Sequence, residues 1–419
     1  MQKQTVTRHL ARFSIHVIIA AALLASAGLI HAIPPNFAVQ LNNPGPLGSA
    51  LNSQFGIAIA GTGKVVYVGA PTFDQDGTDS GAVFAFDQKT GAYQGRPSFG
   101  AFSAADNKIG TALAANKKYW IVGAPGTTLS ANLNAGRVFI LSARGLPSLY
   151  IDNPAPGVGD NFGAALALYK TLLVIGAPKD TAPGGGPAGS GAAYLVNLKT
   201  GLTLVGLIDP GAAAGDTAGA SVAVSKDYIV VGAPGRQVGG FAGAGAVAVF
   251  DAKTAAYLGT LTDPSPNTDD AFGSAVAISG SLVTVGSPNS EYITDAVYTN
   301  AGAVFQFDAA TRTLVRELPE NTYNDGGHRG AAMATDGKLL IVGKPDFYYS
   351  GPNAGSTTTY KYKTGEAIRE NISENPVAGG NFGKAVAAFK GGRYAVGEPF
   401  GQDTSGNIVG AAYMYNKYP

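Results

Sequence analysis

The sequence has no cysteine, one tryptophan and four histidines, and these shortages exclude several kinds of chemistry. Without cysteine there is no disulfide framework, no thiol nucleophile and no cysteine-ligated metal site. His9, His16 and His31 lie in the first 32 residues, which we interpret below as a targeting segment, so His328 is the only histidine in the remainder. A single histidine cannot build a multi-histidine zinc site. A serine–histidine–aspartate triad could use only His328, and we expect no catalytic role for it.

Excess charge of either sign is also missing. The chain has 29 Lys and Arg residues against 28 Asp and Glu residues, and Lys3, Arg8 and Arg12 belong to the first 32. The remainder therefore has 26 basic and 28 acidic residues, a net charge near −2. A partner made of nucleic acid or anionic lipid requires a basic stripe, so we expect neither partner.

The only long apolar run is at the start of the chain. A basic stretch precedes fourteen apolar residues at positions 17–30, and small residues then offer cleavage after Ala27 or after Ala32. This order is typical of a secretory signal peptide, and the run is shorter than the roughly 20 residues of a spanning helix. We predict a signal peptide at residues 1–32 and a secreted, periplasmic or cell-surface protein with no membrane span in residues 33–419. A retained signal anchor is the alternative.

The chain carries two short markers seven times each. The first resembles F-G and is found at Phe55-Gly56, Ile109-Gly110, Phe162-Gly163, Ala218-Gly219, Phe272-Gly273, Arg329-Gly330 and Phe382-Gly383. The second resembles G-A-P, follows about thirteen residues later, and begins at Gly69, Gly123, Gly176, Gly232, Gly286, Gly343 and Gly397. Successive second-marker glycines are 54, 53, 56, 54, 57 and 54 residues apart. A period of this size across the whole chain indicates a repeat architecture.

Each period contains four short runs with strand character, bounded by Gly, Pro or Asp. Such sheets bury both faces when they stack radially, which predicts an all-β fold of four-stranded antiparallel blades in a β-propeller. The chain from residue 33 starts with an extra fourth strand (FAVQLNNP) and ends with a third strand (GAAYMYNKY) that lacks a fourth. We therefore predict a single domain at residues 33–419, with seven blades and a ring closed by the N-terminal strand pairing into the last blade. We expect the marker residues to be architectural, with small residues allowing close backbone approach near the central axis.

The pairing of these markers resembles the FG-GAP repeat family, whose best-known members form the seven-bladed propeller of integrin α-subunits. Calcium-binding blades of that family carry an acidic loop between the markers, whereas the interval here is short, as in Gly61 to Lys64. The chain is thus similar to the short, calcium-free variety, for which the resemblance implies no single activity. A hard cation needs six to eight oxygen ligands, so we expect no metal, including at the single acidic loop Asp74 to Asp79. Quinone-cofactor propellers carry a tryptophan in nearly every blade, and Trp120 is alone here, so we expect no cofactor.

Long loops on a rigid scaffold usually carry function, and here they gather on one rim. The loops between second and third strands have few aromatic or acidic residues in blades two to four, and several in blades five, six, seven and one. Because the ring closes between blades seven and one, these four blades form one contiguous arc. The candidate binding residues are Phe73, Asp74, Asp76, Asp79, Glu291, Tyr292, Asp295, Tyr298, Asp346, Phe347, Tyr348, Tyr349, Glu398, Phe400 and Asp403. Exposed aromatics with carboxylates suit sugar stacking or a protein partner.

Two functional hypotheses remain from the sequence. The first is a monomeric, non-enzymatic recognition module that binds a protein or glycan on this rim. The second is an extracytoplasmic hydrolase that acts on a glycan with two carboxylates at the top of the propeller channel. The ligand itself is not encoded in any motif.

Overall fold

The structure is a computed structural model of the chain, and it describes residues 37–74, 76–141, 147–181, 186–293, 296–320, 323–348 and 351–416. The chain divides into two units, and the second begins at Phe37. The predicted signal peptide lies outside the described residues.

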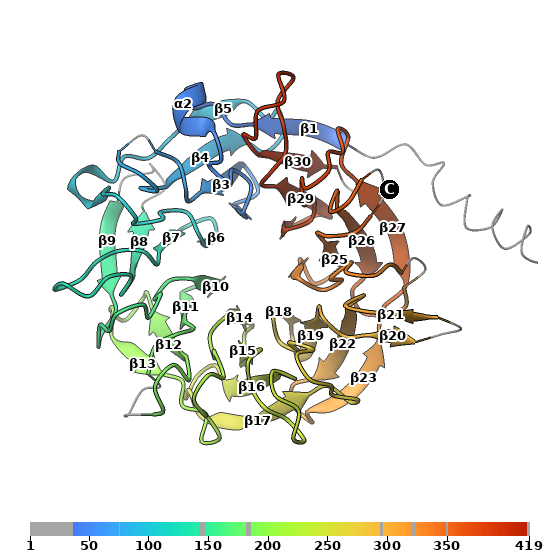
Figure 1. Cartoon of the computed structure of the whole chain (residues 1–419). Helices are drawn as coiled ribbons and strands as arrows, with labels where there is room; N and C mark the ends of the chain where they lie inside the picture. The colour runs from blue at the N-terminus through green and yellow to red at the C-terminus, as the bar shows by residue number, and fades with distance from the viewer. Residues whose placement is uncertain are drawn as a thin grey trace, which may run out of the picture. The chain divides into compact units, whose positions relative to one another are not determined.

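Seven four-stranded antiparallel sheets are arranged around a central axis, which confirms the predicted seven-bladed propeller (Figure 1). The first strand of each blade is innermost and the fourth outermost. Blades 1 to 3 consist of β2 (Ala58–Gly61), β3 (Val65–Ala70), β4 (Ala82–Asp87) and β5 (Tyr93–Gly95); β6 (Leu113–Ala115), β7 (Trp120–Ala124), β8 (Arg137–Leu141) and β9 (Pro147–Asp152); and β10 (Ala165–Tyr169), β11 (Leu172–Ala177), β12 (Ala192–Asn197) and β13 (Leu204–Gly206).

Blades 4 to 7 follow the same order, and blade 5 contains an additional hairpin. They consist of β14 (Ser221–Val224), β15 (Tyr228–Ala233), β16 (Ala246–Asp251) and β17 (Tyr257–Thr262); β18 (Ala275–Ser279), β19 (Leu282–Ser287), β22 (Ala303–Asp308) and β23 (Thr313–Glu317), with the hairpin β20 (Tyr292–Ile293) and β21 (Val297–Tyr298); β24 (Ala332–Thr335), β25 (Leu339–Lys344), β26 (Ser356–Lys361) and β27 (Ala367–Ile372); and β28 (Ala385–Phe389), β29 (Arg393–Glu398), β30 (Ala411–Tyr415) and β1 (Phe37–Asn42). Two short helices, α2 (Leu47–Ala50) and η2 (Gly100–Phe102), lie in connecting segments.

The N-terminal strand closes the ring, as predicted. β1 pairs with β30 so that blade 7 has the order β1-β30-β29-β28. Leu41 is buried in the apolar cluster between blades 7 and 1, and Val39 packs against the same cluster. The last blade is therefore completed by the first strand of the ring, which removes an open sheet edge.

Apolar side chains fill the spaces between neighbouring blades. The buried apolar residues form seven clusters, one at each junction of two blades. At the junction of blades 3 and 4, for example, Val174 and Leu195 of blade 3 pack with Val222, Ile229 and Phe250 of blade 4. The core is thus a ring of seven interfaces, and each junction is named below by the numbers of its two blades.

The markers meet backbone to backbone at these junctions. The amide of Gly163 donates a hydrogen bond of 2.9 Å to the carbonyl oxygen of Gly176 in the same blade. A Cβ atom on Gly176 would lie 2.0 Å from the carbonyl oxygen of Gly219, the first-marker glycine of the next blade. The same clash, at 1.9–2.1 Å, recurs for Gly69 with Gly110, Gly123 with Gly163, Gly232 with Gly273, Gly286 with Gly330, Gly343 with Gly383 and Gly397 with Gly56. The markers are architectural, as expected, but the close approach is between neighbouring blades and not at the axis.

A third repeated glycine was missed in the sequence. It precedes the third strand of each blade, has a positive φ, and lies against the first-marker residue of the next blade. A Cβ atom on Gly191, for example, would lie 2.2 Å from the backbone nitrogen of Ala218. The set is Gly81, Gly136, Gly191, Gly245, Gly302, Gly355 and Gly410. Its regular spacing was visible in the sequence and would have identified it.

Ring closure predicts a large effect of removing β1. A chain that starts at Leu47 loses the burial of Leu41, worth roughly 1.5–3 kcal/mol, the partial burial of Val39 and the β1–β30 ladder. We expect a much lower melting temperature, or aggregation through the exposed edge of β30. Thermal unfolding and light scattering against the chain from residue 33 measure both effects. An unchanged melting temperature in a monomeric truncated protein would contradict the closure.

The glycine contact predicts that Gly176→Ala destabilises the fold. The new Cβ meets a backbone oxygen that cannot move without shifting blade 4, and such overpacking typically destabilises by about 1–3 kcal/mol or more. Gly48→Ala is the control, because a Cβ on Gly48 has nothing within 4 Å. Urea unfolding should show a loss of stability only for Gly176→Ala. Equal urea midpoints for the two variants would contradict the role of the glycine contact.

Candidate ligand-binding rim and its buried junction charges

The candidate site is the rim that carries the loops from the second to the third strand and from each blade to the next. The opposite rim carries tight turns, and in blades 1, 4 and 5 an aspartate accepts hydrogen bonds from the turn backbone. Asp87, for example, accepts from the amides of Lys89 and Thr90 at 2.9 and 2.8 Å. Long loops on a rigid scaffold usually carry function, so the long loops remain the candidate site.

Three of the candidate rim residues are buried. Phe73 packs edge-to-face on Phe84 at 5.3 Å, and Phe347 lies below the Nζ atom of Lys344 at 4.4 Å. Both phenylalanines occupy the same repeat position, four residues after the second-marker glycine, and both side chains point inward. Glu398 has no solvent exposure. In this structure these three side chains support the loops and are not part of the exposed surface.

The acidic residues of blade 1 bind to their own loop. The carboxylate of Asp74 accepts a hydrogen bond of 2.8 Å from the amide of Asp79. Asp76 forms an ion pair with Arg96 at 3.5 Å and accepts a hydrogen bond from Ser103. These contacts are ordinary loop chemistry. Among the described residues, no group of three or more His, Asp or Glu side chains is placed to hold a metal ion.

Blade 7 contributes two further candidates, which are half-buried. The carboxylate of Asp403 accepts hydrogen bonds from the backbone and the side chain of Asn407, and these hydrogen bonds hold the pKa of Asp403 below its usual range. Phe400 lies at the base of the same loop. Asp403 therefore shapes its own turn.

Blade 5 presents a cluster of tyrosines on its additional hairpin. The ring of Tyr292 stacks on that of Tyr323 at 3.6 Å with an interplanar angle of 8°, and Tyr298 lies 6.1 Å from Tyr323. The pKa of Tyr323 is raised mainly by burial and, to a smaller extent, by a hydrogen bond with Tyr292. Glu291 is exposed beside this hairpin. Tyr323 belongs to the next loop and was missed, because only the fold brings it here; Asp295 lies outside the described residues.

Blade 6 pairs the single described histidine with a candidate carboxylate. Nδ1 of His328 and Oδ2 of Asp346 are 2.7 Å apart, and Asn381 of blade 7 donates to Oδ1 of Asp346 at 2.7 Å. Burial alone would raise the pKa of Asp346, but the hydrogen bond and charge of His328 lower it overall. Tyr348 is 62 % exposed, and Tyr349 lies outside the described residues. The candidate arc thus forms local clusters, of which Tyr292–Tyr298–Tyr323 and His328–Asp346–Asn381 are the two that the fold assembles.

Beneath these loops, polar side chains close the junctions. One such position is nine residues before the first-marker residue, and another is two residues before it. The first holds Asn153, Asp209, Asp263, Glu320 and Ser373, and the second holds Asp160, Asp216, Asp270, Gly327 and Gly380, for junctions 2–3 to 6–7 in turn. At junction 2–3 the amide of Asn153 donates to Asp160 at 2.8 Å. The pair varies in charge from one junction to the next.

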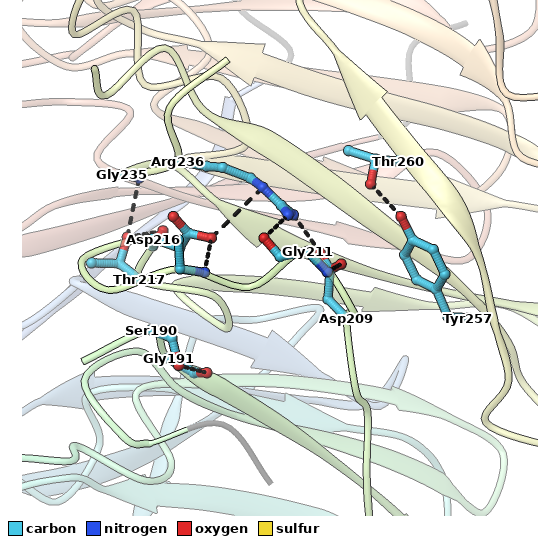
Figure 2. A network of polar contacts seen from close by, with 11 residues as sticks. Ser190, Gly191, Asp209, Gly211, Asp216, Thr217, Gly235, Arg236, Tyr257 and Thr260 are labelled. Atoms are coloured by element: carbon cyan, nitrogen blue, oxygen red, sulfur yellow. Dashed lines mark hydrogen bonds and ion pairs between the residues drawn. The ribbon is translucent and has the colours of Figure 1, made fainter. Parts of the chain in front are cut away.

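Junction 3–4 holds an arginine between its two aspartates (Figure 2). The guanidinium of Arg236 donates to Asp209 and to the carbonyl oxygen of Gly211, and its Nε lies 3.6 Å from Asp216. Burial raises the pKa of Asp216, and Arg236 partly offsets this effect. The arginine therefore offsets part of the negative charge of Asp209 and of the buried Asp216, which come from one loop.

Junction 5–6 replaces apolar marker residues with charges. Arg329 stands at the position of the first-marker phenylalanine and is 1 % exposed. Its Nε lies 3.0 Å from Glu320, and Lys344, at the alanine position of the second marker, lies 2.6 Å from Glu370 and 3.6 Å from Glu320. Arg329 also donates to the hydroxyl of Tyr360 at 3.1 Å. Two buried cations are thus each paired with a carboxylate, of which that of Glu370 is partly exposed, and buried charges are stable only when they are paired.

Junction 6–7 buries a carboxyl group beside two hydroxyls. Ser373 and Tyr413 donate to Oε2 of Glu398 at 2.8 and 2.7 Å. Oε1 has no hydrogen-bond partner among the described residues. A Cβ atom on Gly380 would lie 2.4 Å from Oε1, so the glycine provides the space for this side chain. Burial raises the pKa of Glu398 to about 7, despite the two hydrogen bonds.

The arginine at junction 3–4 predicts a pH-dependent loss in Arg236→Ser, which copies Ser290 at the same position of blade 5. Leaving buried carboxylates without their cation destabilises by about 3–5 kcal/mol at neutral pH, and less once acid protonates them. Lys253→Ser, which breaks an exposed pair with Asp227 at 3.1 Å, should change stability by under about 1 kcal/mol. Urea unfolding at pH 7 and pH 4 measures both; equal losses for the two variants would refute the role of Arg236.

Comparisons with known proteins agree with the fold. The family model for the FG-GAP repeat matches residues 156–196, which run from the loop before blade 3 into β12. A search of curated proteins found no match. No helix among the described residues is long and apolar enough to cross a membrane. The matched segment contains both markers of blade 3, and the other six blades repeat them in the same places. The match at residues 156–196 and the seven-bladed propeller together fit an FG-GAP repeat protein, similar to the N-terminal propeller of integrin α-subunits.

Proposed function

We propose that this propeller is a non-enzymatic recognition module that binds a protein or glycan through the loops of blades 5 and 6. The FG-GAP propeller is a ligand-binding or scaffold fold, and its stability resides in the junctions, which leaves the loops free to carry a site. The observation that carries the proposal is the tyrosine cluster on the β20–β21 hairpin, an element that no other described blade contains.

The cluster offers the chemistry that such a ligand requires. Tyr292 and Tyr323 stack face to face, and both side chains are only half-buried, so part of this aromatic surface is exposed to a ligand. Glu291 and Asp325 are exposed nearby in the same loops and can accept hydrogen bonds from hydroxyl or amine groups. Tyr348 adds an exposed ring on the next blade. Rigid aromatic groups beside acceptors are typical of sugar-binding and protein-binding surfaces.

The hydrolase hypothesis has weaker support. Glu398, whose pKa burial raises to about 7, is fully buried and hydrogen-bonded to Ser373 and Tyr413. A general acid must reach the substrate directly or through one water molecule. In this conformation Glu398 reaches neither, which favours binding over catalysis.

We also propose that the module is exported, with residues 1–32 removed after Ala27 or Ala32. The basic start, the short apolar run and the small residues at both cleavage positions support this. N-terminal sequencing of the protein from its native source decides between removal and a retained anchor.

A binding survey with variants of the rim tests the recognition role. The protein from residue 33 is applied to a glycan array and used in pull-down from extracellular material, and any ligand is then titrated. Tyr292→Ala and Tyr348→Ala should weaken binding about tenfold or more. Phe241→Ala is the matched control, because Phe241 is an exposed aromatic residue (40 %) on the loop of blade 4.

Two outcomes would count against the proposal. Equal weakening by Phe241→Ala would place the ligand elsewhere on the ring. Turnover of a glycan that disappears in Asp346→Asn or Glu291→Gln would instead establish the hydrolase.

A further inference from the structure

Alternate junctions of the ring differ in how their buried carboxyl groups are neutralised. Junctions 3–4 and 5–6 contain the cations Arg236, Arg329 and Lys344. Junctions 2–3, 4–5 and 6–7 bury carboxyl groups that form no ion pair within the described part of the chain. These groups are Asp160 and Asp180, Asp263 and Asp270, and Glu398, all 5 % exposed or less.

At junction 2–3 the two aspartates face each other and neutral groups. Asp180 accepts a hydrogen bond of 2.7 Å from the hydroxyl of Tyr194 and another from the amide of Thr181. Asp160 accepts from Asn153. Burial, with the charge of Asp160 as a further cause, raises the pKa of Asp180 to about 6.

At junction 4–5 the place of Arg236 is taken by Ser290. Asp270 accepts a hydrogen bond from the amide of Asn267, and Asp263 accepts from the amide of Ser265. The charged groups that face Asp270 are Asp263 and the exposed Glu291, both acidic. Burial and these two charges raise the pKa of Asp270 to about 6.

At junction 6–7 Glu398 is surrounded by neutral donors. Its partners are Ser373 from the loop after β27 and Tyr413 from β30, and the loop residues Gly380 and Gly401 contact it from the other sides. Glu374, which follows Ser373 in the chain, is a further acidic group and acts electrostatically on Tyr413. A charged Glu398 would therefore have one oxygen without a partner and no cation nearby among the described residues.

We propose that these three junctions make the folded propeller most stable in acid. As the pH rises to neutral, its stability falls and the blades separate more readily at these three junctions. The proposal stands on the burial and the partners of the five carboxyl groups. It does not depend on which ligand the rim binds.

The direction follows from proton binding in the folded and unfolded chains. An unfolded Asp or Glu side chain titrates near pH 4, whereas Asp180 and Asp270 titrate near 6 and Glu398 near 7 in the fold. Between these pH values the folded chain binds more protons than the unfolded chain does. The free energy of unfolding is therefore greatest at about pH 4 and falls until about pH 7. Hydrogen bonds from turn amides lower the pKa of Asp87 and Asp251. The protonation of these two groups therefore changes the stability of the fold only below about pH 4.

The test is unfolding of the protein from residue 33 at pH 5, 6, 7 and 8. We expect the urea midpoint and the melting temperature to fall from pH 5 to 7 and then to level off. A shift of the size given for Glu398, from 4.5 to about 7, corresponds to an increase of the unfolding constant of up to on the order of 10²-fold.

Substitution then assigns the effect. Glu398→Gln keeps the size of the side chain and copies its protonated form, so it should fold and flatten the dependence on pH, as should Asp270→Asn. Glu366→Gln is the control, because Glu366 forms an exposed pair with Lys361 at 2.8 Å, and it should keep the wild-type slope. A midpoint that rises or stays level from pH 5 to 7, or a full slope in Glu398→Gln, would overturn the proposal.

Hydrogen exchange locates the loosening independently of global stability. The amide of Phe382 bonds to Ala354 across junction 6–7, and that of Arg329 bonds to Ala301 across junction 5–6, at 3.1 and 3.0 Å. After correction for intrinsic exchange, protection at Phe382 should fall between pH 5 and 8 more than protection at Arg329. Equal changes at the two amides would show that the junctions do not open separately.

Discussion

The fold depends on one contact, in which the carbonyl oxygen of a first-marker glycine lies against the Cα atom of the second-marker glycine of the preceding blade. At Gly176 and Gly219 there is no room for a single methyl group. Because the contact is between backbones, it fixes the spacing of neighbouring sheets whatever side chains surround it. Gly397 and Gly56 make the same contact between the last and first blades, so the closing junction follows the geometry of the other six.

This constraint explains why the neighbouring positions can vary so widely. Once the glycines set the distance between blades, the residue beside each glycine only has to fill the remaining space and satisfy its own polar groups. Phe162 does so with an apolar ring at junction 2–3, whereas Arg329 does so at junction 5–6 with Glu320 as its counter-ion. The substitution at Arg329 is matched by Lys344 and Glu370 in the same space. The charges at junction 5–6 therefore balance one another within the junction.

The blade count, the strand order and the ring closure could be predicted from the sequence because each is a property of the repeat. Burial of the loop residues could not. Phe73 and Phe347 read as exposed loop aromatics, yet in the fold both side chains are buried at the same repeat position. Tyr323 reaches Tyr292 from a different loop, and His328 reaches Asp346 across 18 residues. Such pairs depend on loop paths, which no local pattern encodes.

In this scaffold the residues that can vary for binding are separate from the glycine contacts that stabilise the ring. The loops of blades 5 and 6 can change for binding, because the glycine contacts lie below them and do not involve their side chains. The buried carboxyl groups, however, lie between the loops and the glycines: Asp270 precedes the first marker of blade 5, and Glu398 is part of the second marker of blade 7. A change in their protonation therefore acts on the junction and on the base of the rim loops together. Their position, more than their number, couples the stability of the ring to the rim.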